Sequence, residues 1–112
     1  MTESHSIRLA YPWRRRVGEH WTDRVRLPDP HAGVAIYQRS FNVTFDLDTH
    51  RVWLVVDALP HPAPVTVNDI DVGQVAGDKP LDVTAALGSF NRLMLRCDGG
   101  LIGPVRLQIA AR

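Results

Sequence analysis

The feature that most constrains the fold is the near absence of helical periodicity in the chain. Short runs rich in valine, isoleucine, leucine and aromatic residues are separated by eight glycines and eight prolines. Such runs, with turn residues between them, are typical of an all-β sandwich or barrel. A chain of 112 residues can hold one hydrophobic core but not two. We therefore expect a single all-β domain over residues 8–112, preceded by a flexible tail over residues 1–7.

The expected strands follow from alternation and from the positions of Gly, Pro, Asn and Asp. They lie at 8–17 (interrupted near Pro12), 24–27, 35–45, 51–56, 65–68, 70–75, 92–97 and 105–110. In the last two, every second residue is apolar, as in a strand with one buried face. A short helical turn is expected over 83–87, ended by Gly88.

One expected hairpin can be tested for internal consistency. With Asn68 and Asp69 as a two-residue turn, which needs φ > 0 at both positions, the flanking strands come into register. The facing pairs would then be Val67 with Ile70, Thr66 with Asp71, and Val65 with Val72. Apolar pairs fall on one face and the polar pair on the other, a match that a slip of one residue would destroy.

Charge and composition exclude several classes of function. The 13 basic and 12 acidic residues leave a net charge of +1, so we expect no nucleic-acid partner. There is no apolar run near the roughly 20 residues that span a bilayer, and residues 1–8 show no signal-peptide pattern. We expect no membrane partner and a cytoplasmic location. Cys97, the single cysteine, shares a face with Leu93 and Leu95 and is expected to be an inert core thiol.

A series of motifs runs through the middle of the chain. It comprises Tyr37-Gln-Arg-Ser-Phe41, the apolar run 51–57, the hairpin 65–73, and the segment 77–95, which contains Asp82-Val-Thr84. In order and spacing, from about Trp13 to about Leu95, these motifs resemble the N-terminal sugar-binding domain of glycoside hydrolase family 2 enzymes. The resemblance implies a galactose-binding-domain-like jelly roll, with about eight or nine antiparallel strands in two sheets.

The chain departs from that family in several places. Asn68-Asp69 replaces Asn-Gly, Leu81 stands where the family often has Phe, and Gly88-Ser-Phe-Asn91 has one additional residue. The family's catalytic α/β barrel, with its two glutamates, is not among these residues, which contain only Glu3 and Glu19. Glycosidases usually need two carboxylates flanking the bond. We therefore expect no enzyme activity.

The functional hypothesis is a non-catalytic, carbohydrate-binding-like module, accessory to a glycosidase. The alternative is a structural or protein-interaction β-sandwich with no sugar site, self-associating through a sheet face. No cofactor is expected. The five histidines lack the short paired spacing of a transition-metal site, so no metal site is expected from the sequence. Analogy with the family leaves a structural calcium open, although no dense acidic loop is present.

For the sugar site we considered rings and polar groups in expected loops, because sugar CH faces pack on aromatic rings. The segments 18–23, 28–33 and 59–64 are polar or rich in Gly and Pro. The predicted site is shallow and combines Trp21 with His20, Asp23 and His31. The alternative is that Trp21 plugs the end of the sandwich; whether the loops share one end is not fixed by the sequence.

Two further side chains are expected to serve packing. Trp53 lies in the apolar run 51–56, so it is expected in the core or against a sheet face. Arg39 shares the parity of Tyr37 and Phe41, so it is expected to point inward. A buried arginine needs a partner, and Asp57 is the expected one.

Overall fold

The structure, a computed structural model, describes residues 4–112. It contains ten strands and one 3₁₀ turn. Their bounds are β1 (Ser4–Arg8), β2 (Trp13–Val17), β3 (His20–Val25), β4 (Asp29–Asn42), β5 (His50–Val56), β6 (Ala63–Val67), β7 (Ile70–Val75), β8 (Leu81–Asp82), η1 (Thr84–Ala86), β9 (Phe90–Leu101) and β10 (Val105–Ala111).

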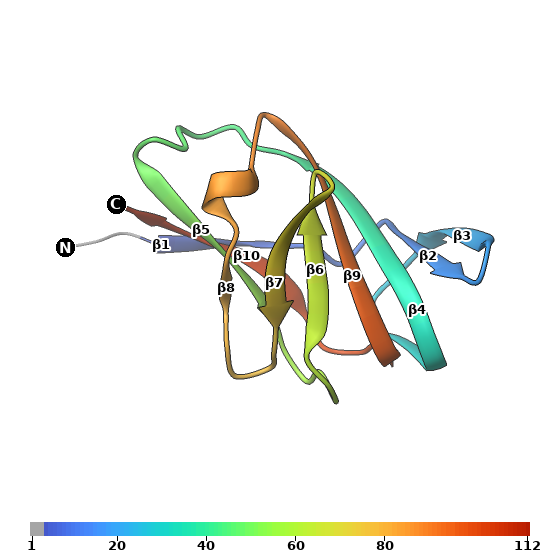
Figure 1. Cartoon of the computed structure of the whole chain (residues 1–112). Helices are drawn as coiled ribbons and strands as arrows, with labels where there is room; N and C mark the ends of the chain where they lie inside the picture. Colours follow the sequence, from blue (N-terminus) through green and yellow to red (C-terminus); the bar gives the residue numbers. More distant parts are fainter. Residues whose placement is uncertain (1–3) are drawn as a thin grey trace.

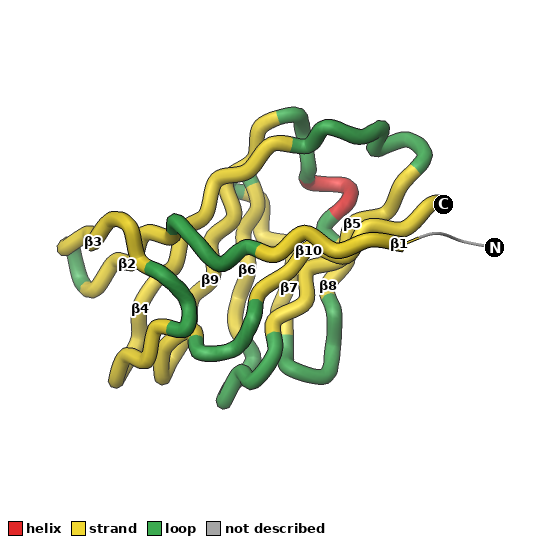
Figure 2. The backbone as a smooth tube through the Cα atoms, turned by 180° about the vertical axis from the view of Figure 1, so that it is seen from behind, coloured by secondary structure: helices red, strands yellow, loops and turns green. Residues whose placement is uncertain are grey.

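The strands form two antiparallel sheets packed face to face (Figure 1). The four-stranded sheet has the order β1-β10-β5-β8, and the six-stranded sheet has the order β3-β2-β4-β9-β6-β7. Seen from behind, β1 and β10 run side by side, so the two ends of the domain lie together in one sheet (Figure 2). The prediction of an all-β jelly-roll sandwich is confirmed.

The core lies between the inner faces of the two sheets. Alternate residues of β5 point inward, with Val52, Leu54 and Val56 all buried. Trp13 is fully buried, and its indole Nε1 donates a hydrogen bond to the Leu9 carbonyl at 2.8 Å. Cys97 is buried on the inner face of β9. The prediction that Cys97 belongs to the core is confirmed.

The N-terminal boundary predicted from the sequence needs correction. Residues 4–7, expected in a flexible tail, belong to β1, which pairs with β10 from Ser4↔Ala110 to Arg8↔Arg106. Polar residues can occupy an edge strand because β10 supplies backbone partners, and the inner face needs few large side chains there. The rest of the expected tail, residues 1–3, lies outside the described residues.

The segments 18–23 and 28–33, expected as loops, are largely strand. Gly18, with φ of 59°, turns the chain between β2 and β3, and β3 extends from His20 to Val25, earlier than the expected strand at 24–27. β4 already begins at Asp29, with a shift in register between Pro30 and Val34. These strand segments lie at or near sheet edges, where polar side chains face solvent, so their composition resembles that of loops.

The hairpin prediction is confirmed at the turn and corrected at its base. Asn68 and Asp69 have φ of 53° and 66°, and the first two pairs lie as expected. Val65, however, pairs with Gly73 instead of Val72. The Asp71 carboxylate accepts a hydrogen bond from the Gly73 N–H at 2.9 Å, and Gly73 has φ of 111°, so a bulge absorbs Val72.

Candidate functional site

The structure places three of the four predicted sugar-site residues on one edge strand, β3. Trp21 is paired with Arg16 of β2, and His20 is paired with Val17 beside the turn. His20 is exposed, whereas Trp21 is half-buried on the outer face of the six-stranded sheet. The alternative prediction, that Trp21 closes the end of the sandwich, is therefore wrong.

The indole of Trp21 is covered by charged side chains of its own hairpin. The guanidinium of Arg14 lies 4.3 Å from the ring centroid, and that of Arg16 lies 5.6 Å from it. Arg14 Nε also donates to the Asp23 carboxylate at 2.6 Å. These cation–π and ionic contacts occupy the groups that were expected to hold a sugar.

His31 lies apart from this cluster. It is a half-buried residue of β4, in the stretch where β4 shifts register against β9. Among residues 4–112, no hydrogen bond or ion pair joins His31 to His20, Trp21 or Asp23. The structure thus brings Trp21 and Asp23 together through Arg14 and leaves His31 outside.

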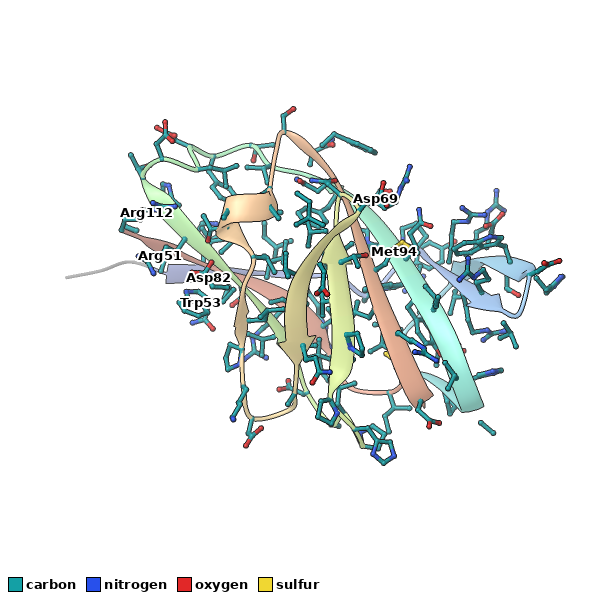
Figure 3. The ribbon with its side chains drawn as sticks, in the orientation of Figure 1. Arg51, Trp53, Asp69, Asp82, Met94 and Arg112 are labelled. Atoms are coloured by element: carbon teal, nitrogen blue, oxygen red, sulfur yellow. The ribbon has the colours of Figure 1, made fainter. Side chains whose placement is uncertain are left out.

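A shallow hollow lies on the outer face of the six-stranded sheet, over strands β4, β9, β6 and β7. Its main part has a volume of about 390 Å³, with Ile36 and Met94 in its floor. Asp69 and Asp71 stand on one side and Arg96 on the other. Figure 3 shows Met94 and Asp69 on this face.

A different tryptophan, Trp53, lies on the outer face of the four-stranded sheet. Its neighbours along β5, Val52 and Leu54, point into the core, so Trp53 points outward, where it is half-buried. Gln108 of β10 is directly opposite it on one side, and Asp82 of β8 on the other. In the sequence Trp53 lies in a run of apolar residues, which favours packing. It alternates, however, with the core residues Val52 and Leu54, and this alternation indicates that its ring points outward.

Positive charges gather around Asp82, beside the Trp53 ring. Arg51 Nη1 lies 3.6 Å from Asp82 Oδ2, and Arg112 lies in the same group (Figure 3). Burial tends to raise the pKa of Asp82, but hydrogen bonds from Thr84 and the charges of Arg51 and Arg112 bring that pKa below its ordinary value. Asp82 is therefore an ionised acceptor at neutral pH, with one oxygen bonded to Thr84 and the other toward Arg51.

The expected pair between Arg39 and Asp57 is wrong. Asp57 continues the outward parity of Trp53 and forms an ion pair with Arg106 at 3.1 Å, on the four-stranded sheet. Arg39 lies on the other sheet, where Nη1 donates to the Ser40 carbonyl at 2.8 Å and Nε has no partner. Burial lowers the pKa of Arg39 accordingly.

A buried polar cluster joins β2 to the start of β4. Arg15 Nη1 donates to both carboxylate oxygens of Asp29 at 2.8 Å, and the Tyr37 hydroxyl donates to Asp29 Oδ2 at 2.7 Å. Burial, together with this hydrogen bond, raises the pKa of Tyr37, and the bond to Asp29 raises the pKa of Arg15. Arg15 Nε is buried and has no hydrogen-bond partner, but the other polar groups of the cluster bind one another, and we assign the cluster to the architecture.

Carboxylates that are close together in the sequence accept hydrogen bonds from backbone N–H groups of the turns in which they lie. Asp46 Oδ1 accepts the Asp48 N–H at 2.9 Å, and Asp71 is engaged by Gly73. Glu19 is exposed at the β2–β3 turn, while Glu3 lies outside the described residues. Within residues 4–112 no group of three His, Cys, Asp or Glu side chains could hold a metal ion. No helix in this part of the chain is long and apolar enough to cross a membrane.

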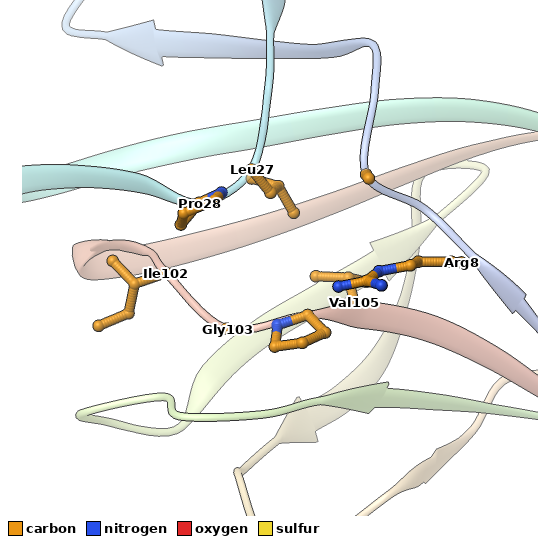
Figure 4. Close-up of a pocket in the computed structure, with 8 residues that line it drawn as sticks. Arg8, Leu27, Pro28, Ile102, Gly103 and Val105 are labelled. Carbon is orange, nitrogen blue, oxygen red and sulfur yellow. The ribbon is translucent and has the colours of Figure 1, made fainter.

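A small cavity opens at one end of the sandwich, between the start of β10 and the segment before β4. It has a volume of about 180 Å³ and apolar walls that include Leu27, Pro28 and Ile102. The side chain of Arg8 extends along it toward Gly103 (Figure 4). Arg8 is the charged residue among those that line it.

Comparison with known proteins defines the architecture. No protein-family model and no curated protein sequence matches the chain. Solved structures of glycosidases do match its fold. They include a Bacteroides uniformis β-glucuronidase (TM-score 0.82, 18% identity), a Dictyoglomus thermophilum β-D-glucuronidase (0.80, 14%) and a Novosphingobium sp. PP1Y rhamnosidase (0.78, 22%).

These matches cover 95–96% of the present chain but only 18%, 28% and 15% of those three glycosidases, respectively. A glycosidase described as a family 2 member, from Bacteroides cellulosilyticus, matches with a TM-score of 0.77 over 93% of the chain. The fold is therefore that of a β-sandwich domain found in large glycosidases, in agreement with the resemblance seen in the sequence.

Proposed function

We propose that the chain is a non-catalytic module that binds carbohydrate on the outer face of its four-stranded sheet and acts as an accessory to a glycosidase. The observation that carries the proposal is the position of Trp53. Its ring lies half-exposed between two polar side chains in register, Gln108 and Asp82. An indole can pack against the CH face of a sugar ring, and an amide and a carboxylate beside it can bind the hydroxyls at the ring edge.

Rigidity of the surrounding strands supports this proposal. β5 and β10 are the two central strands of the four-stranded sheet, and their register is continuous over seven pairs. A ring held on such strands loses little conformational entropy when a ligand stacks on it. The face is open rather than enclosed, so only one side of a sugar is contacted, and we expect dissociation constants near the millimolar range.

An accessory role without catalysis fits both the acidic residues and the structural neighbours. The neighbours are glycosidases in which this fold makes up less than a third of the chain. In the present chain the close aspartate pairs are engaged in turns. We propose that purified protein hydrolyses nitrophenyl glycosides no faster than buffer. Turnover that disappears when one aspartate is replaced would contradict this.

The binding proposal is tested with two tryptophan variants. Neutral and acidic oligosaccharides are first screened on a glycan array, and hits are titrated by NMR at millimolar concentration. We expect Trp53→Ala to weaken binding at least tenfold, because about 1.4 kcal/mol of stacking is lost. Trp21→Ala is the matched control, since Arg14 already covers that ring. Wild-type affinity in Trp53→Ala, with loss in Trp21→Ala, would move the site to the hairpin predicted from the sequence.

A second candidate function, protein interaction, is favoured by the hollow on the other sheet. Its lining combines the apolar side chains of Ile36 and Met94 with the charged side chains of Asp71 and Arg96, which is suited to a partner segment with an apolar side chain and opposite charges. The partner would be the glycosidase itself or a second copy of the chain. Met94→Glu should abolish co-elution with such a partner on size exclusion and leave sugar binding intact.

A further inference from the structure

We propose that the Trp53 face selects carbohydrate chains that carry carboxylates, that is, oligosaccharides of uronic acids. This inference rests on the proposed sugar-binding function and assigns its ligand class. Its basis is the distribution of charge on the outer face of the four-stranded sheet, together with the length of that face.

Arginines dominate this face. By the register of β5, β8 and β10, continued to Arg112, three arginines share the outward side with Trp53, against two aspartates: Arg51, Arg106 and Arg112, with Asp57 and Asp82. The difference of +1 equals the net charge of +1 for the whole chain, so the charges of the remaining residues cancel. A cationic surface of this kind attracts anionic ligands and raises their rate of association.

The arginines lie on both sides of Trp53 along the strand direction. At one end Arg51 and Arg112 flank Asp82 (Figure 3). At the other end Arg106 forms an ion pair with Asp57 at 3.1 Å. Among residues 4–112, Arg112 does not lie within ion-pair distance of a side-chain carboxylate. Its Nε donates to the His50 carbonyl at 3.2 Å, and its other N–H groups retain capacity for a bound anion.

The spacing of these ends suits a short saccharide chain. Arg51 lies two residues before Trp53, and Arg106 is opposite Val55, two residues after it. Four residues of strand measure about 13 Å, longer than one sugar ring. A uronate chain with its middle ring on Trp53 could therefore direct carboxylates to the arginines at both ends. Guanidinium groups bind carboxylates with two parallel hydrogen bonds.

Asp82 and Gln108 distinguish a saccharide from other polyanions. Both offer acceptor oxygens next to the indole, where a hydroxyl-bearing ring needs them. An acidic peptide made of glutamates carries carboxylates but no hydroxyl groups that could donate to these acceptors. The combination of arginines and acceptor oxygens beside the indole therefore favours a uronic acid chain, which carries both carboxylates and hydroxyls.

The test compares two tetrasaccharides that differ only at C6. Cellotetraose carries a hydroxymethyl group on each ring, and the β-1,4-linked glucuronate tetramer carries a carboxylate in its place. Each is titrated against the full chain by NMR, at about 30 mM and about 300 mM NaCl. At low salt we expect the acid tetramer to bind at least about fivefold tighter, and most of that preference to disappear at high salt through screening.

Two double variants locate the preference. In Arg51→Gln/Arg112→Gln we expect the preference for the acid tetramer over cellotetraose to fall below about twofold. The control is Arg92→Gln/Arg96→Gln, which removes the same charge from exposed positions on the other sheet and should keep the preference. Circular dichroism confirms that each variant is folded.

The outcomes separate this inference from the proposed function. Equal affinity for the two tetramers would overturn the inference and leave sugar binding in place. Absence of binding by either tetramer, or by any array saccharide, at millimolar concentration would overturn both. A preference that survives Arg51→Gln/Arg112→Gln, or tetraglutamate binding as tightly as the acid tetramer, would also overturn the inference.

Discussion

Burial, rather than distance, should determine which of two arginine–aspartate pairs stabilises the domain. Arg14 Nε and Asp23 are 2.6 Å apart, but 44% and 69% of their side chains are exposed. Arg15 and Asp29 are 2.8 Å apart, with exposed fractions of only 22% and 16%. Water screens the first pair and competes for its hydrogen bonds, whereas it reaches the second far less.

The expected losses follow from this difference. Asp29→Ala removes the carboxylate that accepts from Arg15 and from the fully buried Tyr37, leaves the Tyr37 hydroxyl only the backbone carbonyl of residue 29 at 3.3 Å, and leaves a guanidinium largely desolvated. Breaking a fully buried pair costs about 3–5 kcal/mol; with some exposure we expect about 2–3 kcal/mol, or roughly 10 °C in Tm. Asp23→Ala should cost less than about 1 kcal/mol.

Urea unfolding of single and double variants measures both effects. Because Arg15→Met removes the unpaired charge, Arg15→Met/Asp29→Ala should be no less stable than Asp29→Ala alone. The coupling between the two positions should then exceed about 1 kcal/mol. Additive losses, or a smaller loss for Asp29→Ala than for Asp23→Ala, would refute the argument from burial.

Three further predictions concern the core. Thr84→Val should cost about 1–3 kcal/mol in urea unfolding, because the Val52 N–H loses its acceptor at 2.8 Å; a loss under about 0.5 kcal/mol would contradict this. Burial raises the pKa of Cys97 to about 12, so a thiol reagent at pH 8 should modify it only in denaturant, and rapid labelling of native protein would contradict this. Gly100→Ala should abolish stable folding or lower Tm by more than about 10 °C. The added Cβ would lie 2.5 Å from Asp29 O and from His31 N, and the backbone φ of 90° is unfavourable for alanine. A wild-type Tm would contradict this and would show that the backbone of β4 can shift to make room.

Sequence reasoning succeeded where side-chain alternation and turn chemistry act together. The Asn68-Asp69 turn was predictable because both residues tolerate positive φ and the flanking pairs match. The bulge at Val72 was not, because it depends on which N–H the Asp71 carboxylate binds. Most of strand β1 was not predicted, because its residues are mainly polar and it is stabilised by pairing with β10. That partner is distant in the sequence: Ser4, for example, pairs with Ala110.

The candidate site was harder to predict because composition does not distinguish an edge strand from a loop. Gly18, His20 and Asp23 indicated a loop, yet the chain pairs through this region as β2 and β3. Trp53 was assigned to packing because its neighbours are apolar. The alternation of Val52 and Leu54 on the inner face places Trp53 outside, although Val55, on the same outward side, is also buried.

The residues that carry the family resemblance mainly hold the architecture together. Asn91, fully buried, accepts from the Gly88 N–H and from Asn68 Nδ2, which ties the segment before β9 to the hairpin. Thr84 links η1 to β5 through the Val52 N–H. Conformational constraints of this kind specify the sandwich whatever ligand it binds.

The face around Trp53 is built largely from other positions. Arg112, Gln108 and Arg106 lie beyond the last motif, in and after β10, and none of their side chains enters the core. Asp82 belongs both to the family motifs and to the face around Trp53, because its Oδ1 accepts a hydrogen bond from Thr84 while its Oδ2 faces Arg51. Substitutions on β10 can therefore change the charge of the face without disturbing the fold, whereas a change at Asp82 affects both. Chains that share the motifs would then differ in ligand through β10, and the motifs alone would not reveal which ligand each one binds.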